Sequence, residues 1–183
     1  LHRVDRRQRQ MCIRDRCVRH ADCQAEKETA MSAQTEQEPF VIRALREEDL
    51  PAVLEIWISA NLQAHDFIPE KYWRENLPMV RQMLPQAQVL VCEAEGKIVG
   101  FSGIDNGHIE GIFVDAPMRS RGIGKALLNE WKRRFPTLTL CVYEKNKRAL
   151  AFYLREGFSK VRLQQDEVTG EMEDMMQWPG VKQ

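Results

Sequence analysis

Two glycines, Gly122 and Gly124, separate an apolar strand-like run from the clearest helical pattern in the chain. This junction constrains the fold more than any other feature. On the predicted helix, residues 122–135, one face carries the large apolar side chains of Leu127, Leu128, Trp131 and Phe135. Glycines at this spacing allow a sharp turn that exposes backbone N–H groups, and a helix N-terminus adds unpaired N–H groups and a positive partial charge. On this spacing alone, an anion-binding turn and a plain glycine-containing helix entry are equally open.

Three basic side chains, Arg119, Arg121 and Lys125, flank these glycines and would place full positive charges beside a pyrophosphate. The turn is not a Rossmann fingerprint, because the third glycine is missing and no alternating parallel strand-helix-strand run surrounds it. It is not a P-loop either, because the earlier glycine is absent and no Ser or Thr follows Lys125.

The remaining apolar pattern predicts strands and helices in a mixed order. Strands are expected over residues 40–44, 89–93, 97–101, 108–114, 138–143, 158–163 and 173–178. Besides the helix at 122–135, helices are expected over residues 50–58, 70–84 and 147–156. A mixed sheet with helices on both faces, an α/β class, is the economical way to bury these elements.

The 27 basic and 27 acidic residues balance over the whole chain, but the net charge of the first 30 residues differs from that of the rest. Residues 1–30 hold eight basic residues against five acidic ones, and residues 31–183 hold 19 against 22. The first segment has no apolar period that could bury a face, so we expect a disordered basic leader. Because Met31-Ser32-Ala33 is a plausible start, we expect that this leader does not belong to the native protein. We expect a linker over residues 31–39, the folded domain over 40–179 and a tail over 180–183. An interaction with nucleic acid would depend wholly on the leader, and none is predicted.

Cysteine usage and hydropathy exclude further classes. The leader cysteines Cys12, Cys17 and Cys23 match no common zinc spacing, so no metal is predicted. Cys92 and Cys141 lie in apolar runs without the spacing of a disulfide framework, which indicates a reducing cytoplasm. No apolar run approaches the roughly 18–20 residues of a membrane-spanning helix, so we expect no membrane partner.

Two blocks of the chain resemble the GNAT superfamily of acetyl-CoA-dependent N-acetyltransferases. The first is that superfamily's Arg/Gln-x-x-Gly-x-Gly/Ala turn, here Arg119-Ser120-Arg121-Gly122-Ile123-Gly124. The second is formed, at the usual spacing, by Asn146, Ala149, Phe152-Tyr153 and Gly157-Phe158. The resemblance covers residues 40–178 and implies the GNAT fold, a central, mostly antiparallel sheet of about six to seven strands flanked by about four helices. Within this superfamily, the chain is similar to small bacterial enzymes that acetylate protein lysines or other amines. The features that carry this similarity are Trp57, the 64–68 segment and Tyr72-Trp73.

The resemblance also implies a cofactor site for acetyl-CoA as co-substrate. The turn residues expected to hold its pyrophosphate are Arg119, Arg121, Gly122, Ile123, Gly124 and Lys125. Asn146 is expected to contact the cofactor arm. The strand residues Ile112, Phe113 and Val114 are expected to present backbone groups to the pantetheine, and an exposed backbone edge is suited to pair with an amide-rich arm.

For the chemistry, the resemblance makes Tyr153 the general acid that protonates the leaving thiolate. The general base is open, because Cys141 occupies a position where some relatives carry Glu. Glu110 is the best remaining carboxylate, and His65 or His108 would serve through a water molecule. A solvated strand position for Glu110 and a structural role for His65 are the alternatives.

Together these features predict a cytoplasmic N-acetyltransferase, a monomer or homodimer, that moves an acetyl group to a primary amine by direct attack in a ternary complex. The acceptor classes left open are a protein lysine or N-terminus, a polyamine and a drug amine. We expect the acceptor site to be built by the loops near His65 and after Gly170. A non-catalytic acetyl-CoA-binding regulatory module is the alternative of another class. Cys141 as an acyl-carrying nucleophile is a further alternative, without a partner His placed by the sequence.

Overall fold

One seven-stranded sheet forms the centre of the molecule in the computed structural model, which describes residues 40–180. In chain order the strands are β1 (Val41–Ala44), β2 (Gln88–Ala94), β3 (Lys97–Asp105), β4 (His108–Val114), β5 (Leu138–Tyr143), β6 (Ser159–Gln165) and β7 (Met172–Trp178). In space the order is β1-β2-β3-β4-β5-β7-β6, and only the neighbours β4 and β5 are parallel. This confirms the predicted mixed, mostly antiparallel sheet.

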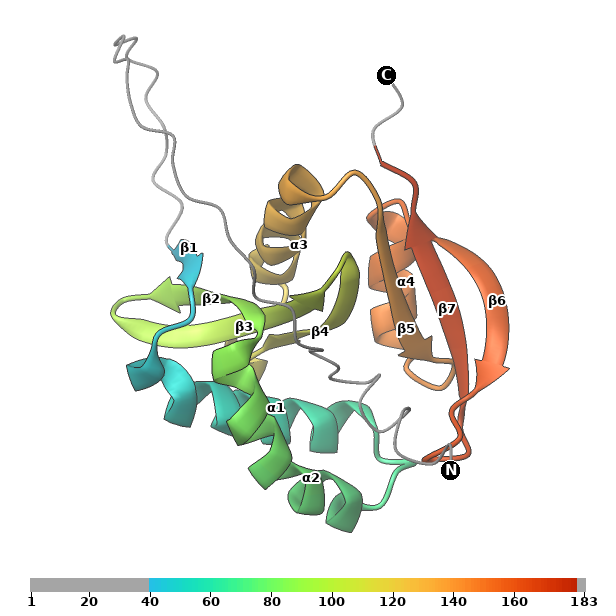
Figure 1. The fold of residues 1–183 in the computed structure, drawn as a ribbon, viewed down its shortest axis with the longest axis horizontal. Coiled ribbons are helices and arrows are strands. Elements are labelled where there is room, and N and C mark those ends of the chain that lie inside the picture. Colours follow the sequence, from blue (N-terminus) through green and yellow to red (C-terminus); the bar gives the residue numbers. More distant parts are fainter. Residues whose placement is uncertain (1–39, 181–183) are drawn as a thin grey trace, which may run out of the picture.

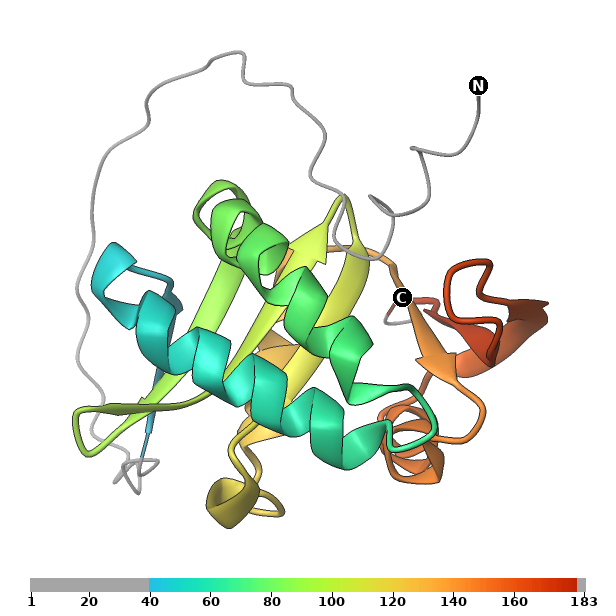
Figure 2. The same cartoon turned by 90° about the horizontal axis from the view of Figure 1, so that it is seen from below.

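Two pairs of helices cover the two faces of this sheet (Figures 1 and 2). The helices are α1 (Leu50–Ala64), α2 (Glu70–Met83), α3 (Ile123–Arg134) and α4 (Lys147–Arg155). A hydrophobic core lies on each face of the sheet. Because side chains alternate along a strand, β2 contributes residues to both cores. Val89 and Val91 pack with α1 and α2, whereas Leu90 and Cys92 pack with α3 and α4. The prediction of helices on both faces is therefore confirmed.

The hairpin between β3 and β4 is tighter than the sequence prediction allowed for. Asn106 and Gly107 both have positive φ, at 46° and 83°, which is typical of a two-residue hairpin turn. As a result β3 extends to Asp105, beyond the predicted end at residue 101.

The predicted leader (1–30), the linker (31–39) and residues 181–183 of the tail lie outside the described residues. Between residues 40 and 180, no helix is both long enough and apolar enough to cross a membrane.

Candidate active site

The two central strands β4 and β5 pair over only two residue pairs and then separate. His108 lies opposite Thr139 and Ile109 opposite Leu140, and no further pair joins the two strands. Beyond this point β5, β7 and β6 run at a large angle to β2, β3 and β4 (Figure 1). One backbone edge of β4, over residues 110–114, is therefore left without a strand partner in the described part of the chain. Residues 112–114, expected to line the pantetheine, lie on this edge.

Glu110 sits where the two strands part. In the pairing of β3 with β4, Gly103 lies opposite Gly111 and Ile104 opposite Ile109, so Glu110 is an extra residue in a β-bulge. Bulges bend a strand and redirect its side chains, and they are common beside active sites. The bulge therefore gives a local reason both for the separation of the strands and for the placement of Glu110.

The turn before α3 presents a row of unpaired backbone N–H groups. Ser120 and Gly122 have positive φ, at 63° and 85°, and Gly122 precedes the first residue of the helix. The first hydrogen bond of the helix runs from the Ala126 N–H to the Gly122 carbonyl, at 2.9 Å. Among residues 40–180, the N–H groups of residues 121–125 have no hydrogen-bond acceptor. This is the geometry that an anion-binding turn requires.

The three predicted cations of this turn have different surroundings. The half-buried Arg119 donates a hydrogen bond from Nε to the Val114 carbonyl at 3.0 Å, which ties the turn to the end of β4. Arg121 and Lys125 are exposed. Burial lowers the pKa of Arg119, and the charge of Arg148 at the start of α4 acts in the same direction. Arg148 therefore adds positive charge near Arg119, and the sequence analysis did not identify it.

The N-terminal part of α3 lies close to both β4 and α4. A Cβ atom added at Gly124 would stand 3.7 Å from the Phe152 ring and 3.8 Å from the Ile112 side chain. The three predicted parts of the cofactor site, on β4, α3 and α4, therefore meet at Gly124.

Tyr153 is a buried residue of α4, with 7% of its surface exposed. Its ring lies edge-on to Phe152 and Phe158, with centroids 5.1 Å and 5.5 Å away. Burial raises the pKa of its phenol above the ordinary value, so the proton stays on the oxygen at neutral pH. Its hydroxyl forms no hydrogen bond with another described residue.

Glu110 and Cys141 follow Ile109 and Leu140, the last paired residues of β4 and β5, and the pKa of each is raised. Burial, with a smaller contribution from Asp105, raises the pKa of Glu110 to about 8. Burial raises the pKa of Cys141 to about 12, with further contributions from Glu173 and Glu110. A carboxyl group with a pKa near 8 exchanges protons near neutral pH and acts as a base in its ionised fraction, which grows as the pH rises towards 8. A thiol with a pKa near 12 stays protonated and is a poor nucleophile. The structure thus disfavours the alternative in which Cys141 carries the acyl group.

His65 contacts Asn146, although 81 positions separate them in the sequence. The His65 Nε2 lies 3.1 Å from the Asn146 Nδ2, and its Nδ1 lies 3.2 Å from the Asn61 Oδ1. Both ring nitrogens are therefore engaged. No hydrogen bond or ion pair joins Glu110 to His65 or to Tyr153 in residues 40–180. The other histidine considered as a base, His108, has its Nδ1 3.0 Å from the Thr139 Oγ1, and burial lowers its pKa.

On the α1 and α2 side of the sheet, two loops approach each other through residues that the sequence analysis did not identify. Tyr143 donates a hydrogen bond to Asp166 in the β6–β7 loop at 2.7 Å, and its ring lies 5.3 Å from His65 in the α1–α2 loop. Lys145 forms an ion pair with Glu171 at 2.8 Å and lies over the Phe67 ring. No local pattern marks these residues, since each partner lies in a different element.

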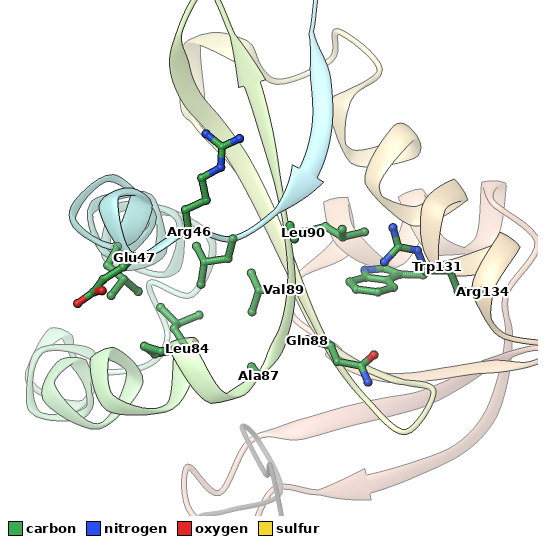
Figure 3. A pocket seen from close by; sticks show the side chains of 13 residues that line it. Arg46, Glu47, Leu84, Ala87, Gln88, Val89, Leu90, Trp131 and Arg134 are labelled. Carbon is green, nitrogen blue, oxygen red and sulfur yellow. The ribbon is translucent and has the colours of Figure 1, made fainter. Parts of the chain in front are cut away.

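A cavity of about 610 Å³ lies elsewhere, between the ends of β1 and β2 and the C-terminal end of α3 (Figure 3). Arg46, Gln88, Trp131 and Arg134 are among its lining residues. None of the predicted site residues lines it. It is therefore distinct from the region where β4, α3 and α4 meet.

The chain resembles known proteins both in sequence and in fold. Residues 85–160 match the family model described as an acetyltransferase (GNAT) domain. The chain is 39% identical over 144 residues to the peptidyl-lysine N-acetyltransferase YiaC of Escherichia coli K12, covering 78% of this chain and 99% of that protein.

Two solved structures share the fold. The solution structure of apo-form YjaB from Escherichia coli has a TM-score of 0.69 at 28% identity, covering 78% of this chain and 99% of that one. The PaiA N-acetyltransferase of Thermoplasma acidophilum, solved with coenzyme A, has a TM-score of 0.63 at 19% identity, covering 75% of this chain and 97% of that one. This chain therefore belongs to the GNAT family and is an N-acetyltransferase that transfers an acetyl group to an amine.

Proposed function

We propose that this enzyme acetylates lysine side chains of proteins and takes the acetyl group from acetyl-CoA. The observation that carries the acceptor class is the 39% identity, over almost the whole of YiaC, to a peptidyl-lysine N-acetyltransferase. The unpaired edge of β4 beside the free N–H groups at the start of α3 supports acetyl-CoA as the donor. We also propose a cytoplasmic enzyme, a monomer or homodimer, whose working unit is residues 40–179.

In this proposal the cofactor lies across the point where β4, α3 and α4 meet. The N–H groups of Gly122, Ile123 and Gly124 hold the pyrophosphate, and the exposed Arg121 and Lys125 add charge. Arg119 acts mainly by fixing the turn to Val114, because its Nε is already bound there. Ile112, Phe113 and Val114 pair their backbone with the pantetheine arm, as an added strand would. Asn146 lies at the start of α4, where it contacts the arm.

The transfer itself joins the lysine nitrogen to the carbonyl carbon of the thioester. A lysine ammonium, with a reference pKa near 10.4, must first lose a proton. Glu110 accepts it, directly or through water, since a carboxyl group with a pKa of about 8 releases and takes up protons near neutral pH. The C–N bond forms, the C–S bond breaks, and the electron pair of the C–S bond remains on sulfur. The nitrogen loses its second proton to solvent as it becomes an amide.

Tyr153 completes the reaction at the leaving sulfur. Its protonated phenol donates a hydrogen bond to the developing thiolate and then supplies the proton that yields the free thiol of coenzyme A. The phenolate left behind regains a proton from solvent. Because burial holds the pKa of Tyr153 above that of a thiol, stabilisation of charge through the hydrogen bond precedes complete proton transfer. His65, with both nitrogens engaged, takes no proton from the amine in this scheme.

The direct test measures thiol release from acetyl-CoA with four acceptor classes: a lysine peptide blocked at its N-terminus, a peptide with a free N-terminus and no lysine, a polyamine and a drug amine. We expect the blocked lysine peptide to give the highest kcat/KM and a mass gain of one acetyl group on the lysine. A higher kcat/KM for any other class would overturn the proposed acceptor. Binding of acetyl-CoA without thiol release in every case would instead favour the non-catalytic module.

A further inference from the structure

A chain of four hydrogen bonds connects α1 with α4 through His65. The Asn61 Nδ2 donates to the Trp57 carbonyl at 2.9 Å, and the Asn61 Oδ1 lies 3.2 Å from the His65 Nδ1. The His65 Nε2 lies 3.1 Å from the Asn146 Nδ2, and the Asn146 Oδ1 accepts from the Ala149 N–H at 3.1 Å.

The two outer bonds determine the direction of the two inner ones. Because Asn61 uses its nitrogen as a donor, its oxygen accepts, and the His65 Nδ1 carries the hydrogen. Because the Asn146 oxygen accepts from α4, its nitrogen donates, and the His65 Nε2 must accept. In these four hydrogen bonds, each donor then faces an acceptor. The arrangement therefore requires the neutral imidazole with its hydrogen on Nδ1.

The surroundings of His65 keep the ring neutral and oriented. Its ring stacks on Trp73 with centroids 5.3 Å apart, and the Phe67 and Tyr143 rings stand against it at 5.7 Å and 5.3 Å. Burial lowers the pKa of His65 to about 4, and Asp66, whose charge opposes that shift, only partly offsets it. Near neutral pH the Nε2 lone pair is available to Asn146 as an acceptor.

We infer that His65 is a positioning residue, which holds the Asn146 carboxamide through its Nε2 and so links the acceptor-side α1–α2 loop to the cofactor site. The inference rests on the proposed function, in which Asn146 contacts the arm of acetyl-CoA. With its oxygen fixed by α4 and its nitrogen fixed by His65, the amide cannot rotate freely. Binding at one side of this contact then alters affinity at the other, and the effect is reciprocal.

Two replacements of His65 separate its hydrogen bonding from its packing. His65→Gln keeps an oxygen that accepts from Asn146 and an amide that donates to Asn61. His65→Phe keeps a flat ring against Trp73 and loses both nitrogens. Phe67→Leu is the matched control, because it disturbs the same ring cluster and leaves the contact with Asn146 in place.

The quantities to measure are KM and kcat for acetyl-CoA, the pH profile of kcat/KM, and the thermal midpoint. We expect His65→Phe to raise the KM for acetyl-CoA about three- to tenfold, the factor that matches the net contribution of one hydrogen bond. His65→Gln should restore most of that loss. In an Asn146→Ala background, His65→Phe should add nothing further to KM, whereas Phe67→Leu should lower the thermal midpoint equally in both backgrounds.

The inference is overturned if His65→Phe and Asn146→Ala raise KM independently of each other. It is also overturned if His65→Gln is as impaired as His65→Phe and the pH dependence of kcat/KM disappears in both, since His65 would then be the general base. The proposed function fails separately, if wild-type protein releases no thiol with any acceptor. Calorimetric binding of coenzyme A to the same variants then still tests the link between His65 and Asn146.

If His65→Phe does not fold, Asn146→Asp tests the same contact from the other side. The aspartate still caps α4, but it accepts hydrogen bonds only and therefore needs a protonated His65 as its partner. We expect its KM for acetyl-CoA to fall as the pH is lowered from 8 to about 6, while that of the wild type does not, because the new carboxylate raises the pKa of His65. Identical pH trends in variant and wild type would contradict the inference.

Discussion

The Tyr143 hydroxyl donates a 2.7 Å hydrogen bond to the Asp166 carboxylate and so joins β5 to the loop between β6 and β7. Both residues are buried. Asp166 in turn accepts from the Thr169 hydroxyl at 3.0 Å and from the Val168 N–H at 2.9 Å, which shapes the loop. Since the Tyr143 ring also stands against His65, one side chain supports the two loops that flank the proposed acceptor site.

Tyr143→Phe tests this support. Removing one partner of a buried carboxylate should cost about 1–3 kcal/mol in the free energy of unfolding. We expect the KM for the lysine peptide to rise several-fold while the KM for acetyl-CoA changes little. The reason is that the lost hydrogen bond holds the β6–β7 loop at the expected acceptor site and does not contact the cofactor site. Denaturant unfolding and steady-state kinetics measure both effects. Ser159→Ala, which removes an exposed hydroxyl from β6, is the control and should alter stability by less than about 0.5 kcal/mol. Equal stability of the two variants would contradict the role of Tyr143.

Glu110→Gln should remove the basic catalyst. In the wild type we expect kcat/KM to rise with pH up to about 8, because the carboxyl group must be ionised to accept a proton. The variant should lose this rise and fall about 100-fold in kcat/KM, in line with general base catalysis. Cys141→Ala, a change at the neighbouring position, should leave the pH profile intact, since a thiol with a pKa near 12 stays protonated. A full pH-dependent rise in Glu110→Gln would exclude Glu110 as the base.

The same carboxyl group should make stability depend on pH. Its pKa is raised in the folded state from 4.5 to about 8, so its contribution is fully present below pH 4.5 and is lost as the pH rises through 8. We therefore expect the wild type to lose more unfolding free energy than Glu110→Gln between pH 5 and about 9. Urea unfolding of both proteins at several pH values gives the comparison, and parallel curves would show that Glu110 is not buried as described.

Tyr153→Phe should lower kcat about 100-fold and leave the KM for acetyl-CoA nearly unchanged, because the phenol acts only on the leaving sulfur. Stability should change little, since the hydroxyl forms no hydrogen bond with another residue between 40 and 180. Tyr143→Phe is a matched loss of a tyrosine hydroxyl with the opposite pattern, a loss of stability and little change in kcat. If Tyr153→Phe kept the wild-type kcat, another proton donor, such as water, would protonate the thiolate, and the role of Tyr153 as general acid would be wrong.

Replacing both Arg121 and Lys125 by alanine should raise the KM for acetyl-CoA about tenfold at low salt and by less at high salt, because exposed charges are screened. The matched control removes two cations from the other end of α3, Arg133 and Arg134. That double variant has the same change in net charge and should keep the wild-type KM. A salt-independent loss, or an equal loss in the control, would argue against a pyrophosphate at the start of α3.

Much of the fold was predictable because local patterns specify it. The strand predicted over residues 138–143 has those bounds in the structure, and the helix predicted over 122–135 spans Ile123–Arg134. Apolar alternation and periodicity are sufficient for such elements. The Asn106-Gly107 dipeptide favours tight hairpins, so the end of β3 is also encoded locally.

The sequence by itself determined the order of the elements, the glycine turn before α3 and the family, because these depend on neighbouring residues and on their spacing. Only the tertiary structure decided that β4 leaves β5 after two pairs, that Glu110 lies in the bulge at that point, and that His65 contacts Asn146. The last two residues are 81 positions apart, and the burial that shifts the pKa of Glu110 and of His65 comes from several elements at once. Hydrogen bonds and desolvation depend on which surfaces meet, and that is a property of the packed molecule rather than of any one segment.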